Sequence, residues 1–201
     1  MTIDDLRFTI YTDSTHTSRL TSHESHSQLI LRLRSAQATF TTHNKLISLA
    51  HIDLLSFQTH LKHTKDASGI AVVFDPVRRK NVRATPEEIV RQLWIIYFLE
   101  KLKLNPKLIS VERALEVHGM KRRFDLVIFD KSTAPILLAE FKAPSILLNQ
   151  MVFDQIAQYN MQMQVPLALV SNGSSHYCFR IDDEKRGFEF LDEIPIYPLA
   201  P

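Results

Sequence analysis

The sequence predicts an α/β fold in which a central mixed β-sheet is flanked by helices. An amphipathic helical pattern begins at Thr85 and is followed by apolar, strand-like runs at 124–130 and 136–142. A second helical pattern covers about 148–163 and precedes another apolar run at 167–171. Helices that alternate with strands along a chain are typical of a sheet covered by helices. We therefore expect the order helix, three strands, helix, two strands.

The first helix is predicted from its start signals and from its apolar spacing. Thr85 is an N-cap candidate, Pro86 follows in the first turn, and Glu88 stands where a capping-box glutamate would stand. Apolar residues then recur at helical spacing through the segment IVRQLWIIYFLEKL. The helix is expected to stop before Asn105-Pro106, because the residue ahead of a proline avoids helical backbone angles.

The strands are predicted from short apolar runs that are bounded by turn residues. The two central runs, FDLVIFD and ILLAEFK, are joined by the turn segment KSTAP, and a basic turn, HGMKRR, is expected before the first of them. Asn172-Gly173 marks a later turn. The predicted strands are 110–117, 124–130, 136–142, 167–171 and 176–181.

Composition divides the chain into three parts. Residues 1–53 are rich in Ser, Thr and His and have little apolar periodicity, so we expect an extension that is poorly structured or helical in patches. Residues 54–84 contain the short apolar run IAVVFDP and are expected to form a β lead-in. Residues 85–201 then form the core. A length of 201 residues fits one domain with such an extension.

The charges are unevenly distributed, although the net charge is only +2. Between Lys62 and Arg123 there are 14 basic and 7 acidic residues. A basic stretch of this kind can attract a polyanion by displacing counterions from its phosphates. A solvated basic surface explains the same charge equally well, so both interpretations stay open.

Several classes of protein are not expected from this composition. No apolar run approaches the roughly 18 residues of a membrane span, so no membrane association is expected. The first residues lack the basic start and the apolar stretch of a secretory signal. Cys178 is the one cysteine, so no intramolecular disulfide can form. A cytoplasmic localisation is the simplest expectation.

Charged residues stand at one end of the hairpin that the two central runs predict. If the turn centres near Ser132-Thr133, Asp125 lies approximately opposite Glu140. Lys142 follows Glu140 by two residues, so both side chains project from one face of the strand. Two carboxylates and an ammonium group are therefore expected to converge at one end of otherwise apolar strands.

Such a cluster suits the hydrolysis of a phosphodiester. Buried charges are costly unless they pair or bind a cation. Facing carboxylates favour a hard divalent ion such as Mg²⁺ (or Mn²⁺), which can polarise a phosphodiester and lower the pKa of a bound water. Lys142 can then orient that water or stabilise charge on the phosphate. The alternative interpretation is an ion pair of Lys142 with Glu140 or Asp125 that only stabilises the end of the sheet.

Several motifs resemble those of the PD-(D/E)XK nuclease superfamily. Asp125, fourteen intervening residues and then Glu140-Phe141-Lys142 are similar to its signature, although Phe124 stands where the name-giving proline would be. The helical segment 155–159, QIAQY, is similar to the Gln-x-x-x-Tyr motif of the recombination-exonuclease branch. Over about residues 54–197 the chain resembles the amino-terminal nuclease domain of type I restriction enzyme R subunits, in a small stand-alone form. The segments that carry this resemblance are FDPVRRK, TPEEIVRQ, KRRFDLVIFD, LLAEFKAPS, FDQIAQYN and LVSNGSSHYCFRID.

The resemblance implies a restriction-endonuclease-like αβββαβ core and a role for each matching residue. It implies that Asp125 and Glu140 bind the metal and that Lys142 is the catalytic lysine. Gln155 and Tyr159 match positions that help to place the phosphate or to brace the site.

Three further residues are assigned to the site. The first core helix of the superfamily often adds a glutamate to the metal site, and Glu88 is predicted for this role in preference to Glu87. The alternative for Glu88 is a capping box with Thr85. Arg122 and Arg123 alternate along the strand that enters the site and are predicted to contact nucleic acid.

These features predict a Mg²⁺-dependent nuclease that hydrolyses DNA phosphodiester bonds in a restriction, defence or repair system. A catalytically inactive nucleic-acid-binding or assembly module with the same fold is the alternative, and an interaction protein with purely structural charges is a third. DNA is the expected partner, with a homodimer or restriction-system subunits as further partners. The chain has four glycines and no loop of the form G-x-x-x-x-G-K-[ST], so no ATP site is expected.

Overall fold

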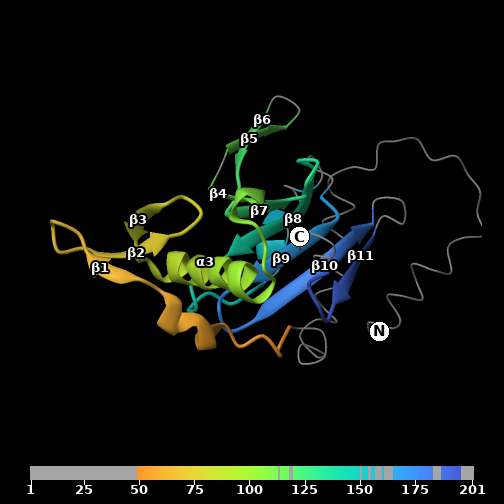
Figure 1. Cartoon of the computed structure of the whole chain (residues 1–201). Coiled ribbons are helices and arrows are strands. Elements are labelled where there is room, and N and C mark those ends of the chain that lie inside the picture. Colours follow the sequence, from red (N-terminus) through yellow and green to blue (C-terminus); the bar gives the residue numbers. More distant parts are fainter. Residues whose placement is uncertain are drawn as a thin grey trace, which may run out of the picture.

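The centre of the protein is a six-stranded mixed sheet with the strand order β11-β10-β9-β8-β7-β4 (Figure 1). A computed structural model of the chain describes residues 49–112, 114–117, 120–149, 151–153, 155–156, 160, 165–182 and 187–195. Strands β8 and β9 run parallel, and the other neighbouring strands of the sheet are antiparallel. The predicted α/β fold with a central mixed sheet is confirmed. The strands are β4 (Ile109–Val111), β7 (Leu126–Phe129), β8 (Pro135–Phe141), β9 (Leu167–Ser171), β10 (His176–Asp182) and β11 (Gly187–Leu191).

Helical segments cover both faces of the sheet. Helix α3 (Pro86–Ile96) packs on one face, where Trp94 is fully buried. The segment between β8 and β9 is helical at 151–153, 155–156 and 160, and its residue Ile156 is buried in a second apolar cluster. Side chains of β8 alternate between the two clusters, as expected for a strand that is covered on both sides. This helical segment also makes the crossover that two parallel strands require.

Helix α3 begins where the sequence predicts. The Thr85 hydroxyl accepts a hydrogen bond from the backbone N–H of Glu88 at 3.2 Å, which satisfies one of the free donors at the helix start. The helix continues as a single π-helical segment, η2 (Tyr97–Lys101). The chain then leaves the helix, and η3 (Pro106–Leu108) is a separate 3-10 turn capped by Asn105. The predicted end of the helix before Asn105-Pro106 is therefore confirmed.

A smaller antiparallel sheet precedes α3. It consists of β1 (His63–Lys65), β2 (Ala71–Asp75) and β3 (Lys80–Arg83), with β2 in the middle. Figure 1 shows it beside α3 and projecting away from the central sheet. The 3-10 helix η1 (Leu54–His60) leads into it. Residues 54–84, expected as a β lead-in, thus contain a complete three-stranded sheet.

The last residues of the predicted extension belong to the folded core. Leu49 and Ile52, which lie in the predicted extension, are buried in the same core as Leu54. The backbone N–H of Leu49 donates to the carbonyl of His176 at 2.9 Å, which ties this segment to β10. Residues 1–48 lie outside the described residues, so the expectation for most of the extension stays a prediction.

The prediction of a single strand at 110–117 is wrong. The run 110–117 is divided between β4 in the central sheet and β5 (Ala114–Val117), which pairs with β6 (Met120–Arg123) in a separate hairpin. The division falls beside Glu112, which has a left-handed backbone conformation with φ of 48° and bends the chain there. Most of the expected basic turn is consequently strand β6.

The turn between β9 and β10 fixes the sheet against α3. Gly173 has φ of 87°, and a Cβ atom at this position would lie 3.0 Å from the Val90 Cγ2 atom of α3. Glycine is therefore required both by the backbone angle and by the close approach of the helix. The predicted Asn172-Gly173 turn is confirmed. None of the helices in the described part of the chain is long and apolar enough to cross a membrane.

Candidate functional site

The β7–β8 hairpin brings Asp125 next to the end of β8. Leu126 pairs with Ala139, so Asp125 stands one step beyond the last paired residue and opposite Glu140. The turn runs from Asp130 to Ala134, close to the predicted centre. The backbone N–H of Phe141 donates to the Asp125 Oδ2 atom at 2.7 Å. The expected register of the hairpin is thus confirmed.

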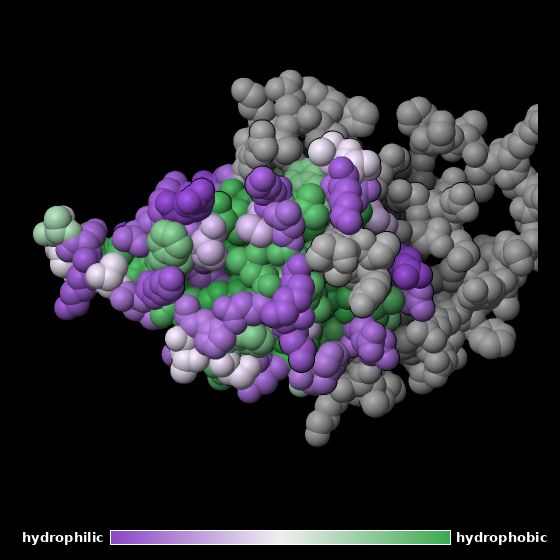
Figure 2. Space-filling view, in the orientation of Figure 1, coloured by the Kyte–Doolittle hydropathy of each residue, from purple (hydrophilic) through white to green (hydrophobic). Residues whose placement is uncertain are grey.

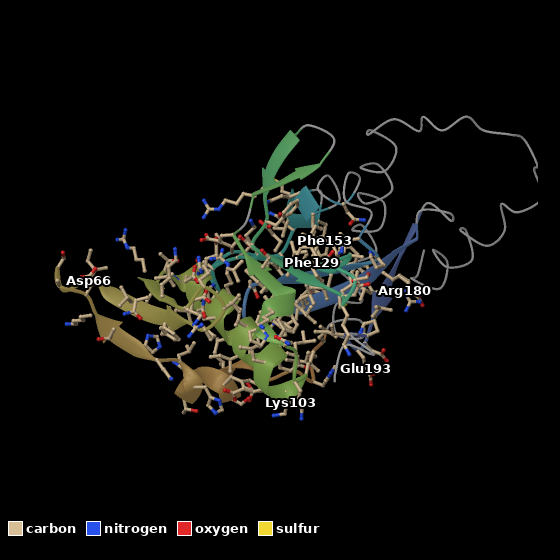
Figure 3. The ribbon with its side chains drawn as sticks, turned by 45° about the horizontal axis from the view of Figure 1, so that its top comes forward. Asp66, Lys103, Phe129, Phe153, Arg180 and Glu193 are labelled. Atoms are coloured by element: carbon tan, nitrogen blue, oxygen red, sulfur yellow. The ribbon has the colours of Figure 1, made fainter. Side chains whose placement is uncertain are left out.

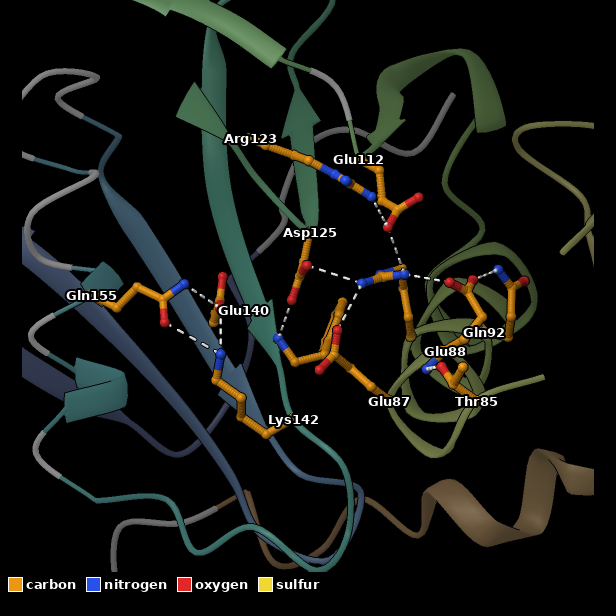
Figure 4. A network of polar contacts seen from close by, with 12 residues as sticks. Thr85, Glu87, Glu88, Gln92, Glu112, Arg123, Asp125, Glu140, Lys142 and Gln155 are labelled. Carbon is orange, nitrogen blue, oxygen red and sulfur yellow. Dashed lines mark hydrogen bonds and ion pairs between the residues drawn. The ribbon is translucent and has the colours of Figure 1, made fainter. Parts of the chain in front are cut away.

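Glu140, Lys142 and Gln155 form a compact hydrogen-bonded group beside Asp125 (Figure 4). The Lys142 ammonium donates to Glu140 Oε1 at 2.7 Å and to Gln155 Oε1 at 3.2 Å. The Gln155 amide also donates to Glu140 Oε1, at 2.6 Å. Glu140 faces the side of the sheet that the crossover helical segment covers, which is why Gln155 reaches it. A residue of the second helix therefore braces the carboxylate and the lysine together.

The surroundings of Glu140 disfavour its ionised form. Burial and the nearby negative charge of Asp125 raise the pKa of Glu140 to about 7, although the hydrogen bond from Lys142 acts in the opposite direction. For Lys142, burial disfavours the charged form, but the hydrogen bond and charge of Glu140 outweigh it and raise the pKa. The two carboxylates therefore repel each other in a site that a further cation would stabilise.

Arg91 is the second cation of the site, and the sequence interpretation missed it. Its guanidinium is almost fully buried and donates to Asp125 Oδ1 at 2.9 Å and to the carboxylate of Glu88. Burial disfavours its charge, but Asp125 and Glu88 raise the pKa of Arg91, which keeps the guanidinium protonated. The available signal was a charged residue within the apolar helical run IVRQLWII, three residues after Glu88.

Glu88 lies in a buried ion network and not beside Glu140. Its carboxylate accepts from Arg91, from Arg78 Nη2 at 2.5 Å and from the Gln92 amide at 2.8 Å. Because Arg91 bridges Glu88 and Asp125, its positive charge stands between these two carboxylates. The capping box is also incomplete: Thr85 accepts from the Glu88 N–H, but the Glu88 carboxylate binds the arginines instead of the helix start.

Glu87 is the helix glutamate whose charge acts on the site. Burial and the charge of Asp125 raise the pKa of Glu87, while the charges of Arg91 and Lys142 act in the opposite direction. Glu87 in turn contributes to the raised pKa of Glu140. The carboxylate is half exposed, with 45% of the side chain accessible, so it has freedom to turn. Its Oε1 atom lies 3.4 Å from Arg91 Nη2, the nitrogen that also donates to Asp125.

The ion network also extends into the small N-terminal sheet. Asp75 is fully buried at the end of β2 and accepts from Arg78 Nε at 2.5 Å and from the Gln92 amide at 2.8 Å. Glu112 accepts from Arg78 and Arg123, and these arginines help to lower its pKa although burial opposes this. The small sheet, α3 and the start of β7 are therefore held together by charge pairs next to the candidate site.

The donor atoms fit a magnesium-type ion bound by few protein ligands. Among the described residues, no group of three or more His, Cys, Asp or Glu side chains is arranged as a metal site. Mg²⁺ commonly binds one or two protein carboxylates and completes its shell with water and substrate phosphate. Asp125 and Glu140 are such a pair. In the part of the chain that the structure describes, no hydrogen bond reaches Glu140 Oε2, which leaves this oxygen available as a ligand.

Two of the predicted site residues cannot be placed by their side chains. Tyr159 lies outside the described residues, and for Arg122 only the backbone in β6 is described. Arg123 is exposed over 67% of its side chain and pairs with Glu112. It therefore lies at the edge of the ion network, on the hairpin that precedes Asp125.

Comparison with known proteins assigns the chain to a family. No curated protein sequence matches it. Residues 86–195, which include α3, the β7–β8 hairpin and the strands up to β11, match the family model described as the type I restriction enzyme R protein N terminus. The match covers 110 of the 201 residues and agrees with the resemblance seen in the sequence motifs. The chain therefore belongs to the family of type I restriction enzyme R protein N-termini.

Proposed function

We propose that the protein is a metal-dependent nuclease of the PD-(D/E)XK type that hydrolyses DNA phosphodiester bonds. One observation carries the proposal: the β7–β8 hairpin gathers the Asp125 and Glu140 carboxylates and the Lys142 ammonium at one end of a buried sheet. The raised pKa of Glu140 supports the assignment, because perturbed carboxyl groups cluster at functional sites. Family membership supports an association with a restriction system.

The contacts of these residues support a hydrolytic role. Asp125 is held in place by Arg91 and by the Phe141 N–H, so its carboxylate is oriented before a substrate arrives. Lys142 is 22% exposed, and Gln155 and Glu140 keep its ammonium at the edge of the site, where it can donate to a phosphate oxygen. Glu140 and Asp125 would hold Mg²⁺ or Mn²⁺, which supplies charge neutralisation at the phosphate and a water of lowered pKa.

Glu87 is the helix residue we propose for the metal environment, in place of Glu88. Its carboxylate is half exposed, and its negative charge contributes to the raised pKa of both Glu140 and Lys142. Glu88 is committed to two arginines and to Gln92. Replacing Glu88 would remove one carboxylate partner from each of Arg78 and Arg91.

A plasmid cleavage assay tests the proposal. Supercoiled plasmid and single-stranded DNA are incubated with the protein and Mg²⁺ or Mn²⁺, beside the variants Glu140→Ala and Lys142→Ala. We expect metal-dependent nicking or linearisation by the parent protein and its loss in both variants. Lys131→Ala is a matched control, because Lys131 is exposed in the turn at the other end of the same hairpin.

The outcomes separate the candidate functions. Cutting that persists in both Glu140→Ala and Lys142→Ala would contradict the proposed site. Salt-sensitive DNA binding without any cutting would favour a catalytically inactive binding module. Absence of both binding and cutting would favour an interaction protein whose charges are structural.

A further inference from the structure

The small sheet presents a defined outer face. Val73 and Asp75 of β2 are fully buried, Val73 in the apolar core and Asp75 in the ion network. Side chains alternate along a strand, so Phe74 points to the opposite face. The register places Asn81 beside Phe74, and Arg83 beside Val72 in the next row. Lys62 joins the Phe74 row, because the Phe74 N–H donates to the Lys62 carbonyl at 3.0 Å.

The basic residues between Lys62 and Arg91 fall into two groups in the structure. Arg91 is buried, and only 12% of the Arg78 side chain is exposed. Both are neutralised by carboxylates, so neither is available as a binding surface. The other bases are exposed, and in the part of the chain that the structure describes none of them forms an ion pair with an acidic side chain. These exposed bases are Lys62, Lys65, Arg79, Lys80 and Arg83.

Few acids offset this charge on the small sheet. Within residues 62–83 the acids are Asp66 and Asp75, and Asp75 is buried and paired. Asp66 lies at the tip of the sheet, where its carboxylate accepts from the backbone of its own turn (Figure 3). Figure 2 shows mainly hydrophilic side chains over the projecting sheet. The exposed charge of the sheet is therefore strongly positive.

A contact between Lys62 and Phe74 orders the side chains of the outer face. The Lys62 ammonium lies over the Phe74 ring, 5.9 Å from its centroid, and the ring remains 37% exposed. This contact limits the motion of the lysine and places an ammonium beside an accessible aromatic surface. Lys62 and Arg83 lie on either side of the middle strand, in neighbouring rows.

The sheet is fixed to the candidate site. Arg78, in the turn between β2 and β3, pairs with Glu88 of α3, and Asp75 accepts from Gln92 of the same helix. Arg91 of that helix binds Asp125. A ligand on the sheet would therefore be held in a set position relative to Asp125.

We propose that the outer face of the β1–β3 sheet binds the phosphate backbone of a nucleic acid through Lys62 and Arg83. This inference rests on the proposed function for the identity of the polyanion, and it adds a binding surface remote in sequence from Asp125. Phosphates are the ligands that exposed lysine and arginine side chains attract, by release of condensed counterions. Exposed aromatic rings beside such bases are common on nucleic-acid-binding surfaces.

Binding without cleavage tests the inference. The fluorescence anisotropy of a labelled DNA duplex of about 30 base pairs is measured in EDTA over a series of salt concentrations, so that cutting cannot occur. We expect the slope of log K against log salt to decrease in magnitude by about two for Lys62→Gln/Arg83→Gln, because each phosphate contact contributes about 0.9. The matched control is Lys103→Gln/Lys107→Gln, which removes two exposed charges near the other end of α3.

The result is independent of catalysis. An unchanged slope in Lys62→Gln/Arg83→Gln, an equal decrease in the control variant, or no binding by the parent would each overturn the inference. Thermal melts of the variants verify that the fold is retained. If binding depends on Lys62 and Arg83 but no cleavage follows when Mg²⁺ is added, the inference stands and the proposed function fails.

Discussion

The ionised form of Glu140 is unfavourable in the folded protein. It is 5% exposed, Asp125 lies opposite it, and its pKa is raised to about 7 from the ordinary value of 4.5. The folded state therefore binds a proton more tightly than the unfolded state between these two values. The stability that protonated Glu140 contributes to the folded state is fully present below pH 4.5 and is lost as the pH rises through 7.

This linkage gives a prediction for the pH dependence of stability. In EDTA, the free energy of unfolding of the parent should fall between pH 5 and pH 8 by about 2 kcal/mol more than that of Glu140→Gln, which cannot ionise there. Urea titrations of both proteins at several pH values measure the difference. Parallel pH profiles for parent and variant would show that Glu140 ionises normally.

The two neighbouring glutamates of α3 should respond differently to substitution. Glu87→Gln removes a half-exposed carboxylate, so we expect little loss of stability but a smaller rise of the melting temperature on addition of Mg²⁺. Glu88→Gln leaves Arg78 and Arg91 poorly compensated and should cost about 3 kcal/mol. Melts with and without Mg²⁺ separate the two effects, and the reverse pattern would restore Glu88 as the metal-site glutamate.

At the scale of elements, α3 connects the small sheet to the central sheet through charge. Arg91 bridges Glu88 of its own helix and Asp125 at the start of β7. Two carboxylates and a cation in such contact are stable only as a set, because each lost partner leaves an uncompensated buried charge. Helix α3 thereby positions Asp125 as well as covering the sheet.

Removing the bridge should be costly. Arg91→Leu should reduce the free energy of unfolding by about 3–5 kcal/mol, because it removes the arginine partner of Asp125 and leaves the buried Glu88 with Arg78 alone. Arg123→Gln is the control: Arg123 is largely exposed, and its loss should change stability by less than about 0.5 kcal/mol. Urea denaturation measures both, and similar values for the two variants would contradict the bridging role.

The elements differ in how far the sequence could predict them. The β7–β8 hairpin was predictable because its register follows from two apolar runs and a short turn, so Asp125 and Glu140 could be paired by counting. The contact of Arg91 with Asp125 was not, because it joins residues 34 positions apart and depends on how α3 crosses the sheet. The division between β4 and β5 at Glu112 was also not predictable, since no local residue pattern indicates a glutamate with a left-handed backbone conformation.

At the scale of the whole molecule, buried and exposed charges have separate roles. The bases between Lys62 and Arg123 form one stretch in the sequence, but the fold pairs Arg78 and Arg91 with carboxylates of the ion network and exposes Lys62 and Arg83 on the small sheet. The charge count alone could not distinguish a solvated surface from a binding surface. The fold provides both a structural network and a candidate phosphate contact.

The proposed site requires that Asp125 and Glu140 bind a divalent cation together. Titration calorimetry with Mn²⁺ at a pH above 7, where Glu140 is ionised, measures this binding without substrate. We predict one saturable site in the parent protein, lost in Glu140→Gln and retained in Asp192→Asn, which removes an exposed carboxylate of the β11 end. Absence of binding in the parent, or equal binding by Glu140→Gln, would contradict the account.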